Sequence, residues 1–499
     1  MTQLLETSRQ PRPQRAASPS ESAGAPRWAL PALVLAGAAC LAAAALVPAS
    51  LEPAPRAWLM TAGFGLVVVA LVLDERRSLA ALWLAIVFLA YGGLSAVIAV
   101  GDPQAGVEPA RFPTPEQAAL GTAPPGYDRH PDSGDFANAA LATVLAGVVC
   151  IGAAAAVGRL APGARVRRRE ISRGRTETFA KRLVLLGFAG VAAALLRFCL
   201  TQLPTDDLQL SIKAFWEGGS YLLLLATFAI PGFGLWLHAA LRRGAPRSEL
   251  LRIAGLMAFY LALLIPTGQR HFVVAMLIAV LAVLVYARTI SVRQLAAVLA
   301  ACVVFFGVTQ AARTVIADSG GFSFGSYLSR LAPGNWDGLY GSQLGSFNWT
   351  AQVEANKELL DIPNPFPRAL LKPIPRQLYP GKSQGFGEEF TRRAYPQTFT
   401  RHVSFAIPLP AESDYAFGLA GVAALFLLLG AAAALGELYW ARGYPAVLAP
   451  LVLATVAWSA FAFVRGDFAN AMVVSAGWLI PVAIASWRLA AKPGPDARR

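Results

Sequence analysis

Charged residues are scarce in this chain of 499 residues: they make up 14% of it, against roughly 25% in soluble domains. Together with a hydrophobic content of 56%, this scarcity excludes an ordinary soluble domain. Cysteine is also rare, and the four cysteines lie in separate apolar runs without a CxxC pair: Cys40, Cys150, Cys199 and Cys302. We therefore expect neither a zinc site nor a disulfide framework, and interpret these thiols as buried apolar side chains.

The sequence signatures of soluble enzymes are missing as well. The chain has no Walker A motif, no GxGxxG fingerprint and no HExxH motif. The short segment 48–56 has one Glu and no DxD-like pair, which argues against a transferase that holds a metal ion there. We expect no metal and no cofactor.

Long apolar runs are what the sequence has in abundance. Most are about 17 to 23 residues long, enough to cross a bilayer core of about 30 Å, and they predict an all-α polytopic membrane protein of about twelve spans. The predicted spans are 28–47, 57–73, 79–100, 136–157, 183–200, 220–240, 253–267, 272–287, 295–311, 416–436, 446–464 and 469–487. Because span 253–267 is short, an alternative is that it forms one re-entrant pair with 272–287.

The charges between the spans indicate the orientation of the chain. One alternating set of loops and both termini holds 26 Lys and Arg against nine Asp and Glu, whereas the other set holds 17 against 20. The basic set is expected to face the cytoplasm. Its segment 158–182 alone has nine basic residues, predicting a topology anchor that contacts anionic lipid head groups. Nucleic acid is not an expected partner, because this segment has a single aromatic residue, Phe179, and no fold to hold it.

The chain is expected to divide into five regions. A disordered cytoplasmic tail, 1–27, precedes spans one to nine at 28–311. A large outer loop, 312–415, leads to spans ten to twelve at 416–488 and a cytoplasmic tail at 489–499. The outer loop has 104 residues, and ordered loops of that length are usually functional.

The outer loop combines basic, acidic and aromatic side chains. Within it, 347–360 is predicted to be a short helix. Its basic residues suit phosphate, since Arg binds phosphate through a bidentate fork: Arg368, Lys372, Arg376, Lys382, Arg392, Arg393 and Arg401. Its aromatic residues offer flat faces for sugars or the membrane interface: Trp336, Tyr340, Trp349, Tyr379, Phe386, Phe390 and Tyr395. Glu412, Asp414 and His402 could accept a proton from a hydroxyl. The alternative is a solvated loop surface.

Four arginines approach the same outer boundary of the membrane. Arg197 lies inside an apolar span near its outer end, Arg270 and Arg465 lie in the shortest outer hairpins, and Arg313 follows span nine. Boundary charges are costly and are candidates for functional sites, although they can also extend to the head groups. Arg465-Gly466-Asp467 matches an adhesion tripeptide, which we interpret as chance.

Three stretches carry a resemblance: TGQR at 267–270, IPRQLYPGK at 374–382 and ESDYAFGLAG at 412–421. They resemble motifs of the bacterial polysaccharide repeat-unit polymerases, the Wzy-type O-antigen polymerase family. The resemblance covers roughly residues 180 to 480. It departs from the family pattern at Tyr379, where a Trp is expected, and in the spacing of the last motif, so that either Glu412 or Asp414 matches the family's acid.

The resemblance implies a metal-independent glycosyltransferase of the GT-C type in the bacterial inner membrane. Its substrates would be undecaprenyl-diphosphate-linked oligosaccharides, as donor and acceptor, and its partners a chain-length regulator and a flippase. We expect Arg270, Arg376 and Lys382 to bind the diphosphate, followed by Arg313, Arg465 and Arg197. Glu412 is the first choice for the proton acceptor and His402 the second, and Trp336, Tyr340 and Tyr379 are expected at the sugars. The alternatives are a ligase of the same fold and a transporter or flippase.

Overall fold

The computed structural model describes residues 29–74, 78–101, 131–160, 173–201, 222, 224–264, 271–286, 345–358, 360–372, 374, 378–379, 385–394, 406–443 and 448–489. Regular structure in these ranges is helical throughout. Eight of the helices are long and apolar enough to cross a bilayer, and two shorter apolar helices accompany them at Phe272–Leu284 and Pro450–Arg465. The chain is therefore an all-α, multi-pass membrane protein.

The helices of the first half follow the predicted spans closely. They are α1 (Ala29–Leu46), α2 (Pro53–Leu73), α3 (Leu79–Phe88), the π-helix η1 (Leu89–Leu94), α4 (Ser95–Gly101), α6 (Ser133–Leu160), α7 (Arg173–Thr201), α9 (Ala229–Arg243), α10 (Arg247–Leu264) and α11 (His271–Tyr286). The tail 1–27 and the predicted span 295–311 lie outside the described residues.

The second half adds three short helices and three long ones. They are α15 (Ser346–Asn356), α16 (Pro365–Ala369), α17 (Phe386–Ala394), α19 (Leu409–Gly443), α20 (Ala449–Arg465) and α21 (Phe468–Leu489). The helix α15 confirms the short helix expected in the large loop. The helix α19 begins at Leu409, seven residues before the predicted span, and its backbone breaks at Gly418 (φ 67°, ψ −171°). Residues 409–415, expected at the end of the loop, therefore form the first turns of a helix.

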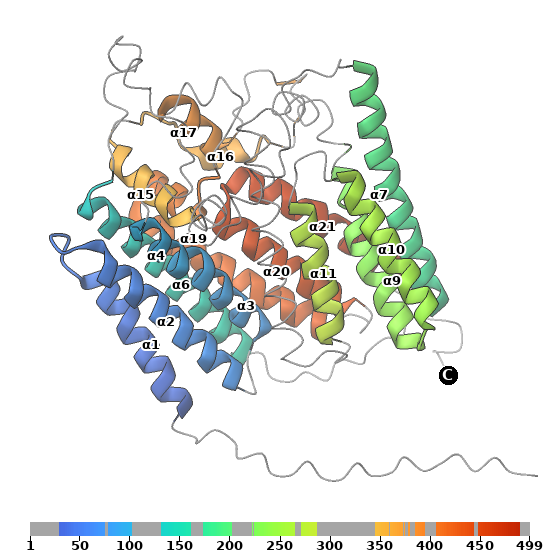
Figure 1. The fold of residues 1–499 in the computed structure, drawn as a ribbon, viewed down its shortest axis with the longest axis horizontal. Helices are drawn as coiled ribbons and strands as arrows, with labels where there is room; N and C mark the ends of the chain where they lie inside the picture. The colour runs from blue at the N-terminus through green and yellow to red at the C-terminus, as the bar shows by residue number, and fades with distance from the viewer. Residues whose placement is uncertain are drawn as a thin grey trace, which may run out of the picture.

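The long helices pack as two groups (Figure 1). One apolar core joins α1, α2, α3, α6 and α19, and a second joins α7, α9, α10, α11, α20 and α21. Close packing relies on small residues: a Cβ on Gly430 of α19 would overlap the Cys150 carbonyl of α6, and one on Gly187 would overlap Ala229. Without a hydrophobic force between helices in lipid, such close backbone approach is a main source of helix association.

The helices α15, α16 and α17 lie together at one end of the long helices, which we call the upper end (Figure 1). The connection between α9 and α10 lies at the opposite, lower end. The start of α15 is attached to α4 directly after η1. After this π-helical segment, the Ser95 side chain accepts a hydrogen bond from the Phe347 backbone N–H at 2.9 Å. The π-segment thus directs a polar side chain of α4 to the start of α15.

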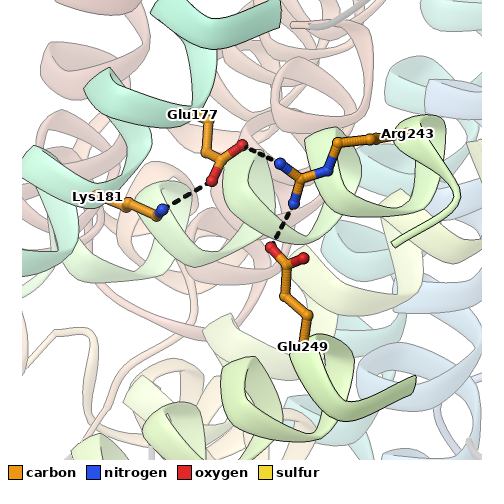
Figure 2. A network of polar contacts seen from close by, with 4 residues as sticks. All are labelled: Glu177, Lys181, Arg243 and Glu249. Carbon is orange, nitrogen blue, oxygen red and sulfur yellow. Dashed lines mark hydrogen bonds and ion pairs between the residues drawn. The ribbon is translucent and has the colours of Figure 1, made fainter. Parts of the chain in front are cut away.

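Two polar contacts tie helices together at the lower end. Glu177 of α7 accepts from Lys181 at 2.7 Å and from Arg243 at 2.8 Å, and Arg243 also pairs with Glu249 of α10 (Figure 2). Glu437 near the end of α19 accepts from the Ser78 hydroxyl at 2.6 Å and from the Leu79 and Ala80 backbone N–H groups at 3.0 and 2.9 Å. It thereby satisfies free N–H groups in the first turn of α3.

Candidate functional site at the upper end

The upper end has its own small apolar core. It joins α15, α17 and the first turns of α19 through buried side chains: Trp349, Val353, Leu360, Ile362, Phe386, Phe390, Ala394, Ile407 and Ala411. Three of the aromatic residues predicted to offer flat faces, Trp349, Phe386 and Phe390, are thus buried in this core. That prediction was wrong for them, because their rings hold the short helices against α19 and are not available to a sugar.

Glu412 lies in the first turn of α19 and is fully buried. Its Oε2 atom accepts a hydrogen bond from the Phe468 backbone N–H at 2.6 Å. Phe468 is the first residue of α21, so Glu412 supplies a partner for one of the N–H groups that no helix satisfies internally. Its Oε1 atom is buried without a hydrogen-bond partner among the described residues.

Asp467, at the turn between α20 and α21, is buried beside the same helix end. Its Oδ1 accepts from the Asn470 backbone N–H at 2.8 Å, which makes Asp467 the N-cap of α21. Its Oδ2 accepts from the Asn470 side chain at 2.9 Å and from the Gly387 backbone N–H at 3.4 Å. Burial raises the pKa of Asp467, although these N–H groups and the charge of Lys372 act in the opposite direction.

Gly385 explains how α17 comes so close to Asp467. Its φ of 141° is a conformation that side chains rarely adopt, and a Cβ at this position would lie 3.0 Å from the Asp467 Oδ2 atom. Glycine is therefore required on both counts. Sequence reasoning treated Asp467 only as part of a chance tripeptide. The signal it missed was an Asp placed immediately before an apolar run, which is a common start of a helix.

A second acidic group lies between α15 and α19. Asp414 accepts from the Lys357 ammonium at 2.5 Å, and the same ammonium lies 3.9 Å from Glu354. Burial, reinforced by the Asp414 carboxylate, raises the pKa of Glu354 to about 8. Asp135 at the start of α6 acts on Glu354 in the same direction. Glu354 was not among the predicted site residues, since one Glu in an amphipathic helix has no distinctive spacing.

Arg465 ends α20, two residues before Asp467 in the chain. Its guanidinium lies over the Phe461 ring, 5.8 Å from the ring centre. Phe461 in turn contacts Tyr91 of η1 edge-on, with ring centres 5.5 Å apart. Aromatic rings thus support the cation from below, and its half-buried side chain stays accessible.

The structure places the other predicted residues less centrally. Arg197 is exposed near the end of α7, which lies at the far side of the molecule from α15 (Figure 1). Tyr379 is 45% exposed, which leaves its ring accessible. Outside the described residues lie His402, Arg270, Arg376, Lys382, Arg313, Trp336 and Tyr340.

A small hollow adjoins the Asp467 contact. Its volume is about 10 Å³, room for one water molecule and far below that of a sugar site. It is lined by Ile362, Pro363, Pro365, Arg368, Ala369, Gly385, Phe386, Glu389 and Ala469. Within the described ranges, no three His, Cys, Asp or Glu side chains are placed to hold a metal ion. The described part of the upper end thus presents a cation and buried acids.

Comparisons of the chain with protein-family models, with curated proteins and with solved structures find no match.

Proposed function

We propose that this protein is a polysaccharide repeat-unit polymerase of the Wzy type, with a GT-C-like fold of twelve membrane crossings. It would join undecaprenyl-diphosphate-linked repeat units at the outer face of a bacterial inner membrane. One observation carries the proposal: α15, α16 and α17 of the large loop meet the 412–421 stretch and the turn holding Arg465 at one place. We infer the reaction from the sequence resemblance, and we propose that it takes place where these segments meet.

The orientation in this proposal puts the upper end outside the cell. The lower end bears the exposed basic residues Arg175, Lys181, Arg182, Arg242 and Arg247, as expected for the cytoplasmic side. Lipid-linked substrates would then approach the upper end from the bilayer, with the diphosphate at the level of the head groups. That level suits Arg465 at the upper end of α20.

The proposed reaction needs charge stabilisation more than metal chemistry. The acceptor hydroxyl oxygen forms a bond to the anomeric carbon of the donor chain, and the bond from that carbon to the diphosphate oxygen breaks. The departing undecaprenyl diphosphate keeps the electron pair. Arg465, with Arg270, Arg376, Lys382 and Arg313, would stabilise that growing negative charge. The hydroxyl proton needs an acceptor, for which Glu412, His402 and Asp414 are the predicted candidates.

The test is polymerisation by purified protein in lipid nanodiscs supplied with one lipid-linked repeat unit. We expect the wild-type protein to form a ladder of lengthening chains. Arg465→Ala should lower its rate on the order of 10²-fold, as removal of one charge-stabilising donor does in other enzymes. The control is Arg252→Ala, an exposed arginine in α10.

Other outcomes would point to the alternative functions. A single transfer to another acceptor, without a ladder, would indicate a ligase. Movement of the substrate across the bilayer without a new glycosidic bond would indicate a transporter. Either result would overturn the polymerase proposal.

A further inference from the structure

The turn between α20 and α21 is held by two buried carboxylates that belong to different elements. Glu412 comes from α19 and binds the N–H of Phe468 at 2.6 Å. Asp467 belongs to the turn itself, caps α21 and binds the N–H of Gly387 in α17. We call these two residues the turn clamp. Through them the turn is joined to a long helix on one side and to the large loop on the other.

The surroundings of Glu412 suit a clamp better than a proton acceptor. Its side chain has no exposed surface, so a sugar hydroxyl could not reach it unless α21 moved away. One of its oxygens is already occupied by the first N–H of α21. An acceptor at a helix start satisfies an N–H group that the helix leaves unpaired, and Glu412 serves there as such a structural acceptor.

The clamp determines where Arg465 lies. Only Gly466 separates Arg465 from Asp467, so fixing Asp467 and Phe468 fixes the backbone that carries the arginine. From below, the Phe461 ring supports the guanidinium at 5.8 Å. The cation is therefore set by contacts on both sides: the aromatic side chain of α20 and the clamped turn.

We propose that Glu412 and Asp467 are positioning residues that hold Arg465 against the lipid diphosphate, and that neither takes the proton of the acceptor. This proposal rests on the proposed function, because it takes the diphosphate as the ligand of Arg465. It changes the role that the sequence suggested for Glu412. The acceptor of the proton would then be found elsewhere in the large loop or at the start of α19.

Substitutions that keep or remove the hydrogen-bond acceptor separate the two roles. Glu412→Gln keeps an oxygen for the Phe468 N–H but cannot take up a proton, so a positioning role predicts a rate within about 3-fold of wild type. Glu412→Ala removes the contact and should lower the rate as much as Arg465→Ala does. The double variant Glu412→Ala/Arg465→Ala should be no slower than Arg465→Ala alone, since residues that act through one another are not additive.

The clamp also has a readout that does not depend on activity. Hydrogen exchange of the backbone amides at 466–470 should accelerate at least 10-fold in Glu412→Ala and Asp467→Ala, and stay unchanged in Glu412→Gln. The matched control is Ser413→Ala. Ser413 is equally buried beside Glu412 in the first turns of α19, and its hydroxyl donates to carbonyls of its own helix, those of Leu409 and Pro410.

Three results would overturn the proposal, and they are distinguishable from failure of the proposed function. Loss of polymerisation in Glu412→Gln with normal exchange would make Glu412 the proton acceptor. Normal exchange in Glu412→Ala would mean that there is no clamp, even if Arg465→Ala abolishes the ladder. In the third result, Arg465→Ala polymerises normally while hydrogen exchange accelerates in Glu412→Ala. The turn clamp would then exist, but Arg465 would not bind the diphosphate as proposed.

Discussion

Glu354 is a carboxylate held away from water between α15 and α19. Its Oε1 atom is buried without a hydrogen-bond partner among the described residues, and Lys357, the nearest cation, pairs more closely with Asp414. Burying a charge without a full set of partners is costly. The neutral, protonated form of Glu354 is therefore favoured in the folded protein, which is why its pKa is raised.

This raised pKa makes stability depend on pH. The folded protein binds the proton of Glu354 more tightly than the unfolded chain does. The resulting stabilisation of the folded state is fully present below the usual Glu pKa of 4.5, and it is lost as the pH rises to about 8. We expect the melting temperature to fall across that window, and Glu354→Gln to flatten the fall. The raised pKa of Asp467 acts in the same direction and leaves a residual slope.

Thermal unfolding in nanodiscs at several pH values would measure these slopes. The matched control is Glu358→Gln, which changes an exposed carboxylate four residues further along the same segment. Identical slopes for Glu354→Gln and for wild type would contradict the assignment.

At the scale of elements, the contact of α6 with α19 depends on one missing side chain. A Cβ at Gly430 would overlap the carbonyl group of Cys150, and both helices would have to separate to admit it. We expect Gly430→Ala to destabilise the protein by about 1 to 3 kcal/mol, the usual cost of overpacking. Thermal or denaturant unfolding of the purified protein would measure it.

Gly152 of α6 provides the control for this substitution. A Cβ there would meet no atom within 4 Å, so Gly152→Ala should be neutral or slightly stabilising. Equal effects of the two substitutions would show that helix propensity, and not contact with Cys150, determines the outcome.

The sequence predicted helices well and their contacts poorly, for a physical reason. Apolar length alone reveals a membrane span, because the bilayer imposes it, and each predicted span within the described ranges coincides with a helix. The break at Gly418 and the early start of α19 escaped this reasoning, since Leu409 to Tyr415 includes two acids and looks like loop. Those acids are tolerated in a helix because Phe468 and Lys357 provide their partners.

Site residues were harder to predict than helices because their partners come from remote segments. Glu412 was identified from a motif, yet its partner is 56 residues away at the start of α21. Nothing in the local sequence shows that Asp467 faces Gly387 of α17. Trp349 and Phe390 are also far apart in the sequence, so the sequence did not show that their rings pack against each other and are not available for sugars.

At the scale of the whole molecule, large apolar side chains cover the outside of the long helices. Several are more than half exposed: Leu35, Leu46, Leu185, Leu196, Leu200, Leu251, Leu428 and Trp487. Such a surface would aggregate in water but is expected in contact with lipid chains. It supports the assignment to the membrane independently of hydropathy.

The proposed orientation can be tested by cysteine labelling. In a chain whose four cysteines are replaced by serine, we would introduce Ser248→Cys at the lower end or Glu358→Cys at the upper end, both at exposed positions. A membrane-impermeant maleimide applied to intact cells with a permeable outer membrane should label position 358 and not 248. The reverse pattern would contradict the orientation, and detergent-opened cells provide the control that both sites can react.

The π-helical segment 89–94 has a consequence for the gene. It fits one residue more into its turn than an α-helix would, and so takes up that residue without rotating the helix that follows in α4. Deleting one codon within 89–94 would therefore restore a regular α-helix and leave Ser95 on its present face, whereas deleting one codon in the regular helix α3 would turn Ser95 by about 100° around the helix axis and away from Phe347. After the deletion in α3, the loop helix α15 would lose an attachment point although no contact residue had been mutated. Reading frame and hydropathy would both survive such a deletion, so it would pass unnoticed in a sequence comparison that scores only composition.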